Sequence, residues 1–304
     1  MEEKDINRLE KIWHKVPVWR RQSLIEDIEE LGDSDYVLSF ENFVLFALND
    51  SDPKVREIAI RSLWDYESRE AIKPFINMLE NDPVLEVKAA AAGALGKFVY
   101  LGEIEEIPQK IFNEIETLLL NKINSSEPLL VRRRALEAMG YSSREEIPAL
   151  IKTAFQSDNN EWKASALLAM GRSANERWIP QIKSMLESDI PELRYEAVRS
   201  AGELEAKTCV PALVKLLDDD DDDITLAALW SLSQIGGKGI REILEKRLED
   251  ALTEDEADFI ESALENLDFT EDTSRFSLLD YSAEGEGLDD LDDEIFDFDD
   301  EDED

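Results

Sequence analysis

The sequence predicts an all-α protein: a right-handed α-solenoid of about eight antiparallel helix pairs, followed by a disordered acidic C-terminal tail. The first observation is a motif, represented by Asp-Ile-Pro-Glu-Leu-Arg-Tyr-Glu-Ala-Val-Arg-Ser-Ala-Gly at residues 189–202, that returns along most of the chain. The second is its register, with steps of 32, 44, 31, 31 and 31 residues between Val55, Val87, Val131, Trp162, Leu193 and Ile224. A fixed period in this range is typical of solenoids.

The third observation is an apolar segment between successive copies, usually entered through a proline. These prolines are Pro74, Pro108, Pro148, Pro180 and Pro211. Proline near the first helical position loses no helical hydrogen bond, so each one marks a helix start. One period therefore holds two short helices and two turns.

The helix pairs follow this register along residues 1–267, which we expect to form one solenoid domain. We expect pairs at 5–32, 35–64, 69–100, 144–172, 176–203 and 207–235, with a longer fourth pair after the third and an eighth at 240–267. The first and last pairs carry acidic residues at most outward positions, which is typical of capping repeats.

The fourth pair exceeds the usual period by 12 residues. Residues 111–123 keep helical spacing, so the insertion is expected to lengthen a helix, which would project on the order of 10 Å at about 1.5 Å per residue. Two interpretations stay open, a contact for a partner and a tolerated insertion.

The pattern Asp…Val-Arg…Ala…Ala-Leu-Gly, together with the short period, resembles the HEAT repeat, and in particular the bacterial HEAT-like repeats of the phycobilisome-lyase type. The resemblance covers most of residues 5–266. It implies a HEAT/ARM-like superhelix, and mostly a protein-binding scaffold with only occasional enzymes.

Residues 268–304 form the predicted tail. They contain 18 Asp or Glu against one Arg, and apolar residues such as Ile295, Phe296 and Phe298 interrupt the acid. Such composition predicts disorder, and the acidic-hydrophobic alternation is typical of segments that fold on a partner.

Composition excludes several classes of partner. The net charge of −39 argues against nucleic acid and anionic membranes, and favours a basic protein partner. No apolar run approaches the roughly 20 residues of a membrane helix. The N-terminus lacks the pattern of a signal peptide, and a single cysteine, Cys209, fits a reducing compartment, so we expect a cytoplasmic protein.

Acidic and basic residues recur at similar offsets at the second helix of each pair. They are Asp52 with Arg56, Asp82 with Lys88, Glu127 with Arg132, Asp158 with Lys163, and Asp189 with Arg194. We interpret them as a stacked ladder, in which each acid caps a helix and pairs with a base of the same or the next repeat.

No residue pattern predicts catalysis, a cofactor or a metal. The aspartate run 218–223 lacks the spacing of a calcium loop, and Gly236-Gly-Lys-Gly239 lacks the context of a P-loop, so it is expected to be a turn. One histidine, His14, and one cysteine leave no catalytic triad and no iron site. We therefore expect a non-enzyme.

A stripe on the second helices is the candidate binding site. Two columns vary strongly between copies, so we expect them to be exposed on the concave face. The predicted partner-binding residues are Arg61, Arg133, Glu137, Leu168, Tyr195, Arg199 and Trp230, with Ile295, Phe296 and Phe298 as a tail motif.

The leading hypothesis is a scaffold that binds a protein on its concave face, with the tail either contacting a basic partner or competing for the groove near Arg133 and Arg199. Two alternatives stay open. One is an accessory subunit of a lyase or other enzyme acting on a chromophore or a modified protein. The other is an acidic, chaperone-like binder of basic proteins. The sequence leaves the oligomeric state open.

Overall fold

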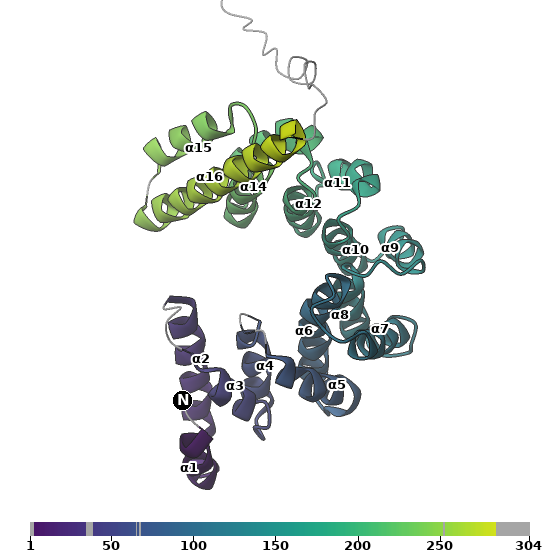
Figure 1. Ribbon diagram of the computed structural model, residues 1–304, viewed down its shortest axis with the longest axis vertical. Coiled ribbons are helices and arrows are strands. Elements are labelled where there is room, and N and C mark those ends of the chain that lie inside the picture. The colour runs from purple at the N-terminus through teal and green to yellow at the C-terminus, as the bar shows by residue number, and fades with distance from the viewer. Residues whose placement is uncertain (1–2, 35–38, 65, 67, 252, 284–304) are drawn as a thin grey trace, which may run out of the picture. The chain divides into compact units, whose positions relative to one another are not determined.

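The computed structural model describes residues 3–34, 39–64, 66, 68–251 and 253–283 (Figure 1). Within these residues the regular secondary structure is entirely helical, so the prediction of an all-α solenoid is confirmed. None of the helices found there is both long and apolar enough to cross a membrane. The chain divides into two compact units, residues 1–231 and 232–304.

In the described part of the chain the helices follow one another as eight pairs, in agreement with the expected number of about eight. Their bounds are α1 (Glu3–Trp13) with α2 (Val18–Ser34), α3 (Glu41–Ala47) with α4 (Pro53–Ser62), α5 (Ile72–Asn81) with α6 (Leu85–Glu103), α7 (Gln109–Ile123) with α8 (Leu129–Met139), α9 (Ile147–Phe155) with α10 (Asn160–Arg172), α11 (Ile179–Met185) with α12 (Pro191–Glu203), α13 (Val210–Lys215) with α14 (Asp222–Ile235), and α15 (Ile240–Glu249) with α16 (Glu254–Ala283). The unit boundary falls within α14.

The predicted proline signals lie at helix starts. Pro148, Pro180 and Pro211 occupy the first turn of α9, α11 and α13, and Pro108 is the N-cap of α7. At these positions the missing amide hydrogen removes no helical bond.

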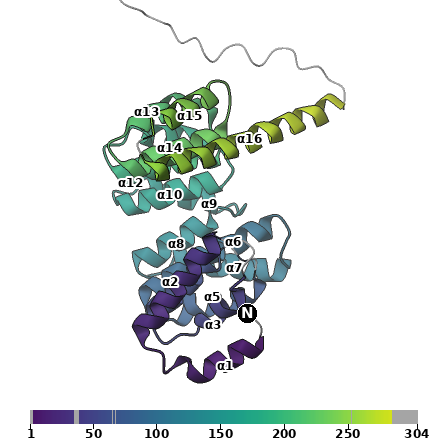
Figure 2. The same cartoon turned by 90° about the vertical axis from the view of Figure 1, so that its left-hand side faces the viewer.

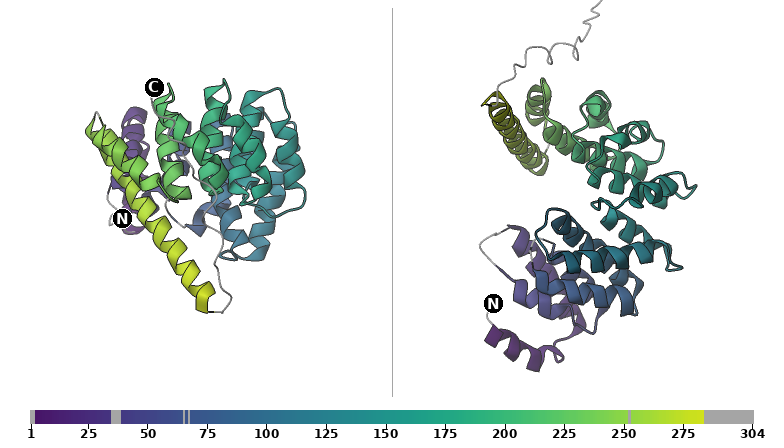
Figure 3. Two further views of the ribbon diagram at one scale, coloured as in Figure 1. Left: turned by 90° about the horizontal axis from the view of Figure 1, so that it is seen from above. Right: turned by 45° about the vertical axis from the view of Figure 1, so that its right-hand side comes forward.

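The first unit has two layers. The second helices of the pairs, α2, α4, α6, α8, α10 and α12, pack on one another in chain order and form the inner layer. The first helices, such as α5, α7, α9 and α11, pack on their partners and form the outer layer (Figure 1; Figure 3, right).

Glycines in the repeated motif bring the inner helices close together. A Cβ added at Gly96, Gly140 or Gly171 would lie 3.0, 2.8 and 2.9 Å from the Cα atoms of Ala138, Ala169 and Ser200 respectively. Each glycine thus faces the small-residue position of the next repeat. This contact explains why the motif keeps a glycine and a small residue in register.

The 12 extra residues of the 44-residue step are shared by two helices, α6 of the third pair and α7 of the fourth. α6 has 19 residues where α10 and α12 have 13, and α7 has 15 where α9 has 9. Gly102 near the end of α6 packs against the ring of Phe112 on α7, so little space separates the two helices there. The expected single projecting helix is therefore corrected to two lengthened helices that pack on each other.

A charge ladder is present, but it differs from the prediction: of the five acids only Asp52 is the N-cap of its helix, and Asp82 and Glu127 pair with bases of the preceding repeat. Asp52 caps α4, while Arg56 makes a two-point bond to Asp82 at 2.8 and 2.9 Å, and Lys88 lies 3.5 Å from Glu127. The base of one repeat thus pairs with the acid of the next. At the N-terminal end, buried Arg21 and Asp50 form a rung that the sequence pattern did not reveal.

Of two further rungs, the first departs from this pairing and the second repeats it. Arg132 donates to the Ile123 carbonyl at 2.9 Å and lies over the Trp162 ring. Arg194 makes a two-point bond, with both distances 2.9 Å, to Asp219 within the aspartate run. The run therefore supplies a ladder acid before the acidic first turn of α14.

The second unit contains α15 and α16, which pack on each other. Gly236, Gly237 and Gly239 have positive φ and form the expected turn before α15. α16 continues past Leu267, where we expected the repeats to end, and runs unbroken to Ala283 (Figure 2). Arg241 of α15 bonds Asp268 and Glu271 of α16 at 2.6 and 3.0 Å, which stabilises the helix beyond that point.

Candidate functional site

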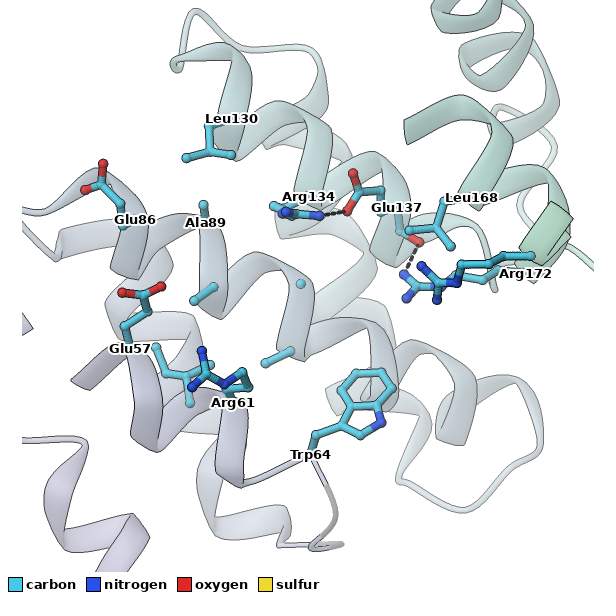
Figure 4. Close-up of a pocket in the computed structure, with 15 residues that line it drawn as sticks. Glu57, Arg61, Trp64, Glu86, Ala89, Leu130, Arg134, Glu137, Leu168 and Arg172 are labelled. Atoms are coloured by element: carbon cyan, nitrogen blue, oxygen red, sulfur yellow. Dashed lines mark hydrogen bonds and ion pairs between the residues drawn. The ribbon is translucent and has the colours of Figure 1, made fainter. Parts of the chain in front are cut away.

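The inner layer of the first unit carries an open groove of about 470 Å³ (Figure 4). Its lining comes from five successive inner helices and from Trp64, two residues after the end of α4. It consists of Glu57, Ile60, Arg61 and Trp64 at α4, Glu86, Ala89, Ala90, Gly93 and Ala94 of α6, Leu130, Arg134 and Glu137 of α8, Leu168 and Arg172 of α10, and Arg199 of α12.

Small residues of α6 form the floor. A Cβ built at Gly93 meets no other atom within 4 Å, so the groove is open directly above this residue. Ala89 is buried, and Ala90 and Ala94 are half-buried. With larger residues at these positions, side chains of α6 would fill the space.

Trp64 forms one wall. It stands at the motif position that holds glycine in Gly96, Gly140, Gly171 and Gly202. An indole does not fit between closely packed helices, and the side chain points into the groove with 41% of the residue exposed (Figure 4). Lys97 of α6 donates to the Trp64 carbonyl and fixes the backbone there.

A buried carboxylate organises the opposite end. Glu137 of α8 is only 4% exposed, yet both its oxygens are paired: Arg134 donates to Oε2 and Ser165 of α10 donates to Oε1, each at 2.6 Å. Arg133 donates to the same serine oxygen at 2.9 Å and pairs with Glu161 at 3.0 Å. This network links α8 to α10 and satisfies the buried charge.

Two further guanidinium groups are held in place by aromatic rings. Arg172 lies 5.1 Å from the Tyr141 ring centroid and donates to the Glu137 carbonyl at 3.0 Å. Arg199 lies 5.6 Å from the Tyr195 ring centroid and 3.6 Å from Glu196. The ring contact and the hydrogen bond restrict the rotamers of Arg172, and the ring contact and the ion pair restrict those of Arg199.

Burial shifts the pKa values of two glutamates that lie beside these arginines. Burial raises the pKa of Glu196 and of Glu203 above the ordinary value of 4.5, although Arg199 and Arg172 oppose the shift. No hydrogen bond reaches Glu196 Oε2 from the residues that the structure describes. When Glu196 is ionised, its negative charge is therefore only partly balanced by its surroundings.

The structure brings together four of the predicted site residues, Arg61, Glu137, Leu168 and Arg199, in one groove. The expected exposure is wrong at Glu137 and Leu168, which are 4% and 6% exposed. Glu137 can be buried because both oxygens of its carboxylate are paired. A motif position that varies between repeats and carries a charge is therefore not always exposed to solvent.

The other predicted residues lie elsewhere. Arg133 turns toward Ser165 and Glu161, and neither Arg133, Tyr195 nor Trp230 belongs to the groove lining. Tyr195 supports Arg199 from beside the groove. Ile295, Phe296 and Phe298 lie outside the described residues, so the tail motif stays a prediction.

Sequence reasoning missed Trp64, Arg134 and Arg172. Trp64 carried a usable signal, because it replaces the repeated glycine. Arg134 follows Arg133 directly, and a shift of one residue turns a side chain by about 100° around a helix axis. Arg172 follows the motif glycine, and its stacking on Tyr141 depends on a tertiary contact that the pattern does not contain.

The site offers little for metal or nucleophilic chemistry. No cluster of three or more His, Cys, Asp or Glu side chains suited to a metal ion occurs in the described part of the chain. His14 is exposed near the end of α1, as expected. Cys209 is buried, and burial raises the pKa of its thiol. What the groove provides is a small-residue floor, an indole and several guanidinium groups.

Comparison with protein families finds that the model for HEAT repeats matches residues 41–109 and 179–268, slightly more than half of the chain. No curated protein gives a significant match. Solved structures with similar architecture have low sequence identity to this chain.

The structure of YibA from Escherichia coli is 15% identical, covers 81% of this chain and 96% of that chain, and has a TM-score of 0.44. The complex of CpcE and CpcF of phycocyanin lyase from Nostoc sp. PCC7120 is 21% identical, with coverages of 76% and 95% and a TM-score of 0.49. Human deoxyhypusine hydroxylase is 14% identical, with coverages of 88% and 97% and a TM-score of 0.39.

Proposed function

Because this chain belongs to the HEAT-repeat family, we propose that it is a non-enzymatic scaffold that binds a protein partner in the groove of its first unit. HEAT repeats generally bind proteins. The observation that carries the proposal is the groove itself, about 470 Å³ in volume, in which Trp64, Leu130 and several arginines surround a floor of small residues. Tryptophan and arginine are the residue types most enriched at binding hot spots.

The lining is suited to recognition more than to catalysis. Its titratable groups are arginines and glutamates, and Glu137, the most buried of them, is committed to Arg134 and Ser165. A general base needs a group within reach of a nucleophile or a bound water, and the groove holds neither a histidine nor a cysteine.

The floor also supports a binding role. A helix surface of alanine and glycine allows a partner backbone or a bulky side chain to approach α6 closely, and the restrained arginines lose little freedom on binding. The acidic tail, as a further part of the proposal, modulates this binding.

The test is affinity capture from the source cells with the full chain and two variants. Gly93→Gln fills the groove, and Ala149→Gln adds the same side chain at an exposed position of outer helix α9. Glutamine is a good helix former, so both variants are expected to fold. A partner retained by wild type and by Ala149→Gln, and lost by Gly93→Gln, supports the proposal. A partner retained by all three excludes the groove as its site.

A further inference from the structure

The charge of the groove differs from that of the chain. The chain carries a net charge of −39, but the lining contains four arginines and three glutamates. Arg61 donates two hydrogen bonds to the carboxylate of Glu29, so it adds little net positive charge to the groove. At the end formed by α8, α10 and α12, the lining holds Arg134, Arg172 and Arg199 against a single glutamate, Glu137. Glu196 and Glu203 lie beside Arg172 and Arg199 but are not part of the lining.

These three arginines keep donors for a ligand. Arg134 bonds Glu137 through one nitrogen, and its side chain is 45% exposed. Arg199 has a side chain that is 38% exposed, and its nearest carboxylate, Glu196, is 3.6 Å away. A guanidinium has several N–H donors in a plane, so one intramolecular contact leaves others for a carboxylate.

The α4 and α6 end of the groove is apolar. Trp64 is 41% exposed, and the floor at Gly93 is open. Leu130 of α8 is half-buried beside this floor. A bulky apolar side chain placed between the indole and the floor would remove apolar surface on both partners from water.

We infer that the groove binds an acidic linear segment of the partner, with one or more carboxylates on Arg134, Arg172 and Arg199 and a bulky apolar side chain beside Trp64. This inference rests on the proposed function and specifies the chemistry of its ligand. The net charge of the chain favours a basic partner, and basic residues of that partner would contact the acidic surface outside the groove. The segment that enters the groove meets arginines and is therefore acidic.

The test uses a phage-displayed library of random peptides, selected on the immobilised full chain. Enriched peptides are synthesised with a fluorophore, and their affinity is measured by anisotropy for wild type, Gly93→Gln, Arg172→Gln, Arg199→Gln and the outer-helix variant Lys152→Gln. Thermal unfolding of each variant shows that it is folded. Two arginine variants are used because Arg172 also contacts Tyr141 and Glu137, whereas Arg199 is more exposed.

The expected result is enrichment of peptides that combine Asp or Glu with Trp, Phe or Leu. Their affinity should fall by about tenfold or more in Arg172→Gln, Arg199→Gln and Gly93→Gln, and stay unchanged in Lys152→Gln. Enrichment of basic or uncharged peptides whose affinity still falls in Gly93→Gln would overturn this inference and leave the proposed function standing. Peptides indifferent to Gly93→Gln would contradict the groove as a binding site, and the absence of any enriched peptide would overturn the inference.

Discussion

Gly93 and Gly102 lie on the same helix, α6, but in different surroundings. At Gly93 an added Cβ meets open space, whereas at Gly102 it would overlap the ring of Phe112. Alanine at Gly93 should therefore raise the free energy of unfolding by about 0.5–1 kcal/mol, because only the entropic cost of glycine is removed. Alanine at Gly102 should lower it by about 1–3 kcal/mol through overpacking. Urea denaturation of both variants measures the two effects, and changes of the same sign would contradict this packing.

Glu196 should make the stability of the protein depend on pH. Burial raises the pKa of this carboxyl in the folded state above its ordinary value of 4.5. The folded state then binds this proton more tightly than the unfolded state, so the contribution of Glu196 to stability is greatest below pH 4.5 and is lost as the pH rises through the folded-state pKa.

Glu196→Gln removes this ionisation. The variant should be more stable than wild type at neutral pH, and the difference should vanish in acid below the ordinary pKa. Denaturant unfolding at a series of pH values measures it. A variant that is less stable at neutral pH would show that the pair with Arg199 outweighs the burial of the charge.

The charge ladder is a property of whole elements, because each rung joins consecutive inner helices or their preceding turns. Asp219→Asn removes the carboxylate that Arg194 holds in a two-point bond. The Arg194 side chain, which is only 16% exposed, is then left with a neutral and weaker partner. We expect a loss of about 1–3 kcal/mol in unfolding free energy. The neighbouring Asp220, which is exposed, provides the matched control Asp220→Asn, for which no comparable loss is expected.

The pH dependence of this rung has the opposite sign to that of Glu196. The hydrogen bond from Arg194 lowers the pKa of Asp219 below its ordinary value of 3.8. The stabilisation is therefore present at pH values above 3.8 and is lost as the pH falls through the folded-state pKa. A difference between Asp219→Asn and wild type that persisted unchanged in strong acid would contradict an ionic origin.

At the scale of the whole molecule, the tail hypothesis predicts an effect on affinity. Residues 284–304 contain acidic and aromatic residues and no Lys or Arg, which is the chemistry inferred for the groove ligand. If this segment competes with the partner, a chain ending at Ala283 should bind the partner more tightly than the full chain. Unchanged or weaker binding, measured by titration at physiological salt, would contradict competition. Weaker binding would favour a tail that contacts the partner directly.

Most of the fold was predictable, because the same motif returns at a nearly constant spacing along the chain. The glycine and small-residue positions, the prolines and the charged positions recur in register, and each has one packing role in every repeat. The site was predictable only in part. The variable columns identified Arg61 and Arg199, but whether a side chain faces the groove or a neighbouring helix depends on contacts between repeats. Arg133 and Arg134 show this, since one bonds Ser165 and the other lines the groove.

The most direct test of the central claim is hydrogen–deuterium exchange of the full chain with and without its captured partner. If the groove is the binding site, amides of α6 and α8 around Gly93 and Arg134 should exchange more slowly in the complex, while amides of outer helices α5, α7 and α9 should be unchanged. Protection confined to the outer helices, with exchange in α6 and α8 unaltered, would contradict the account.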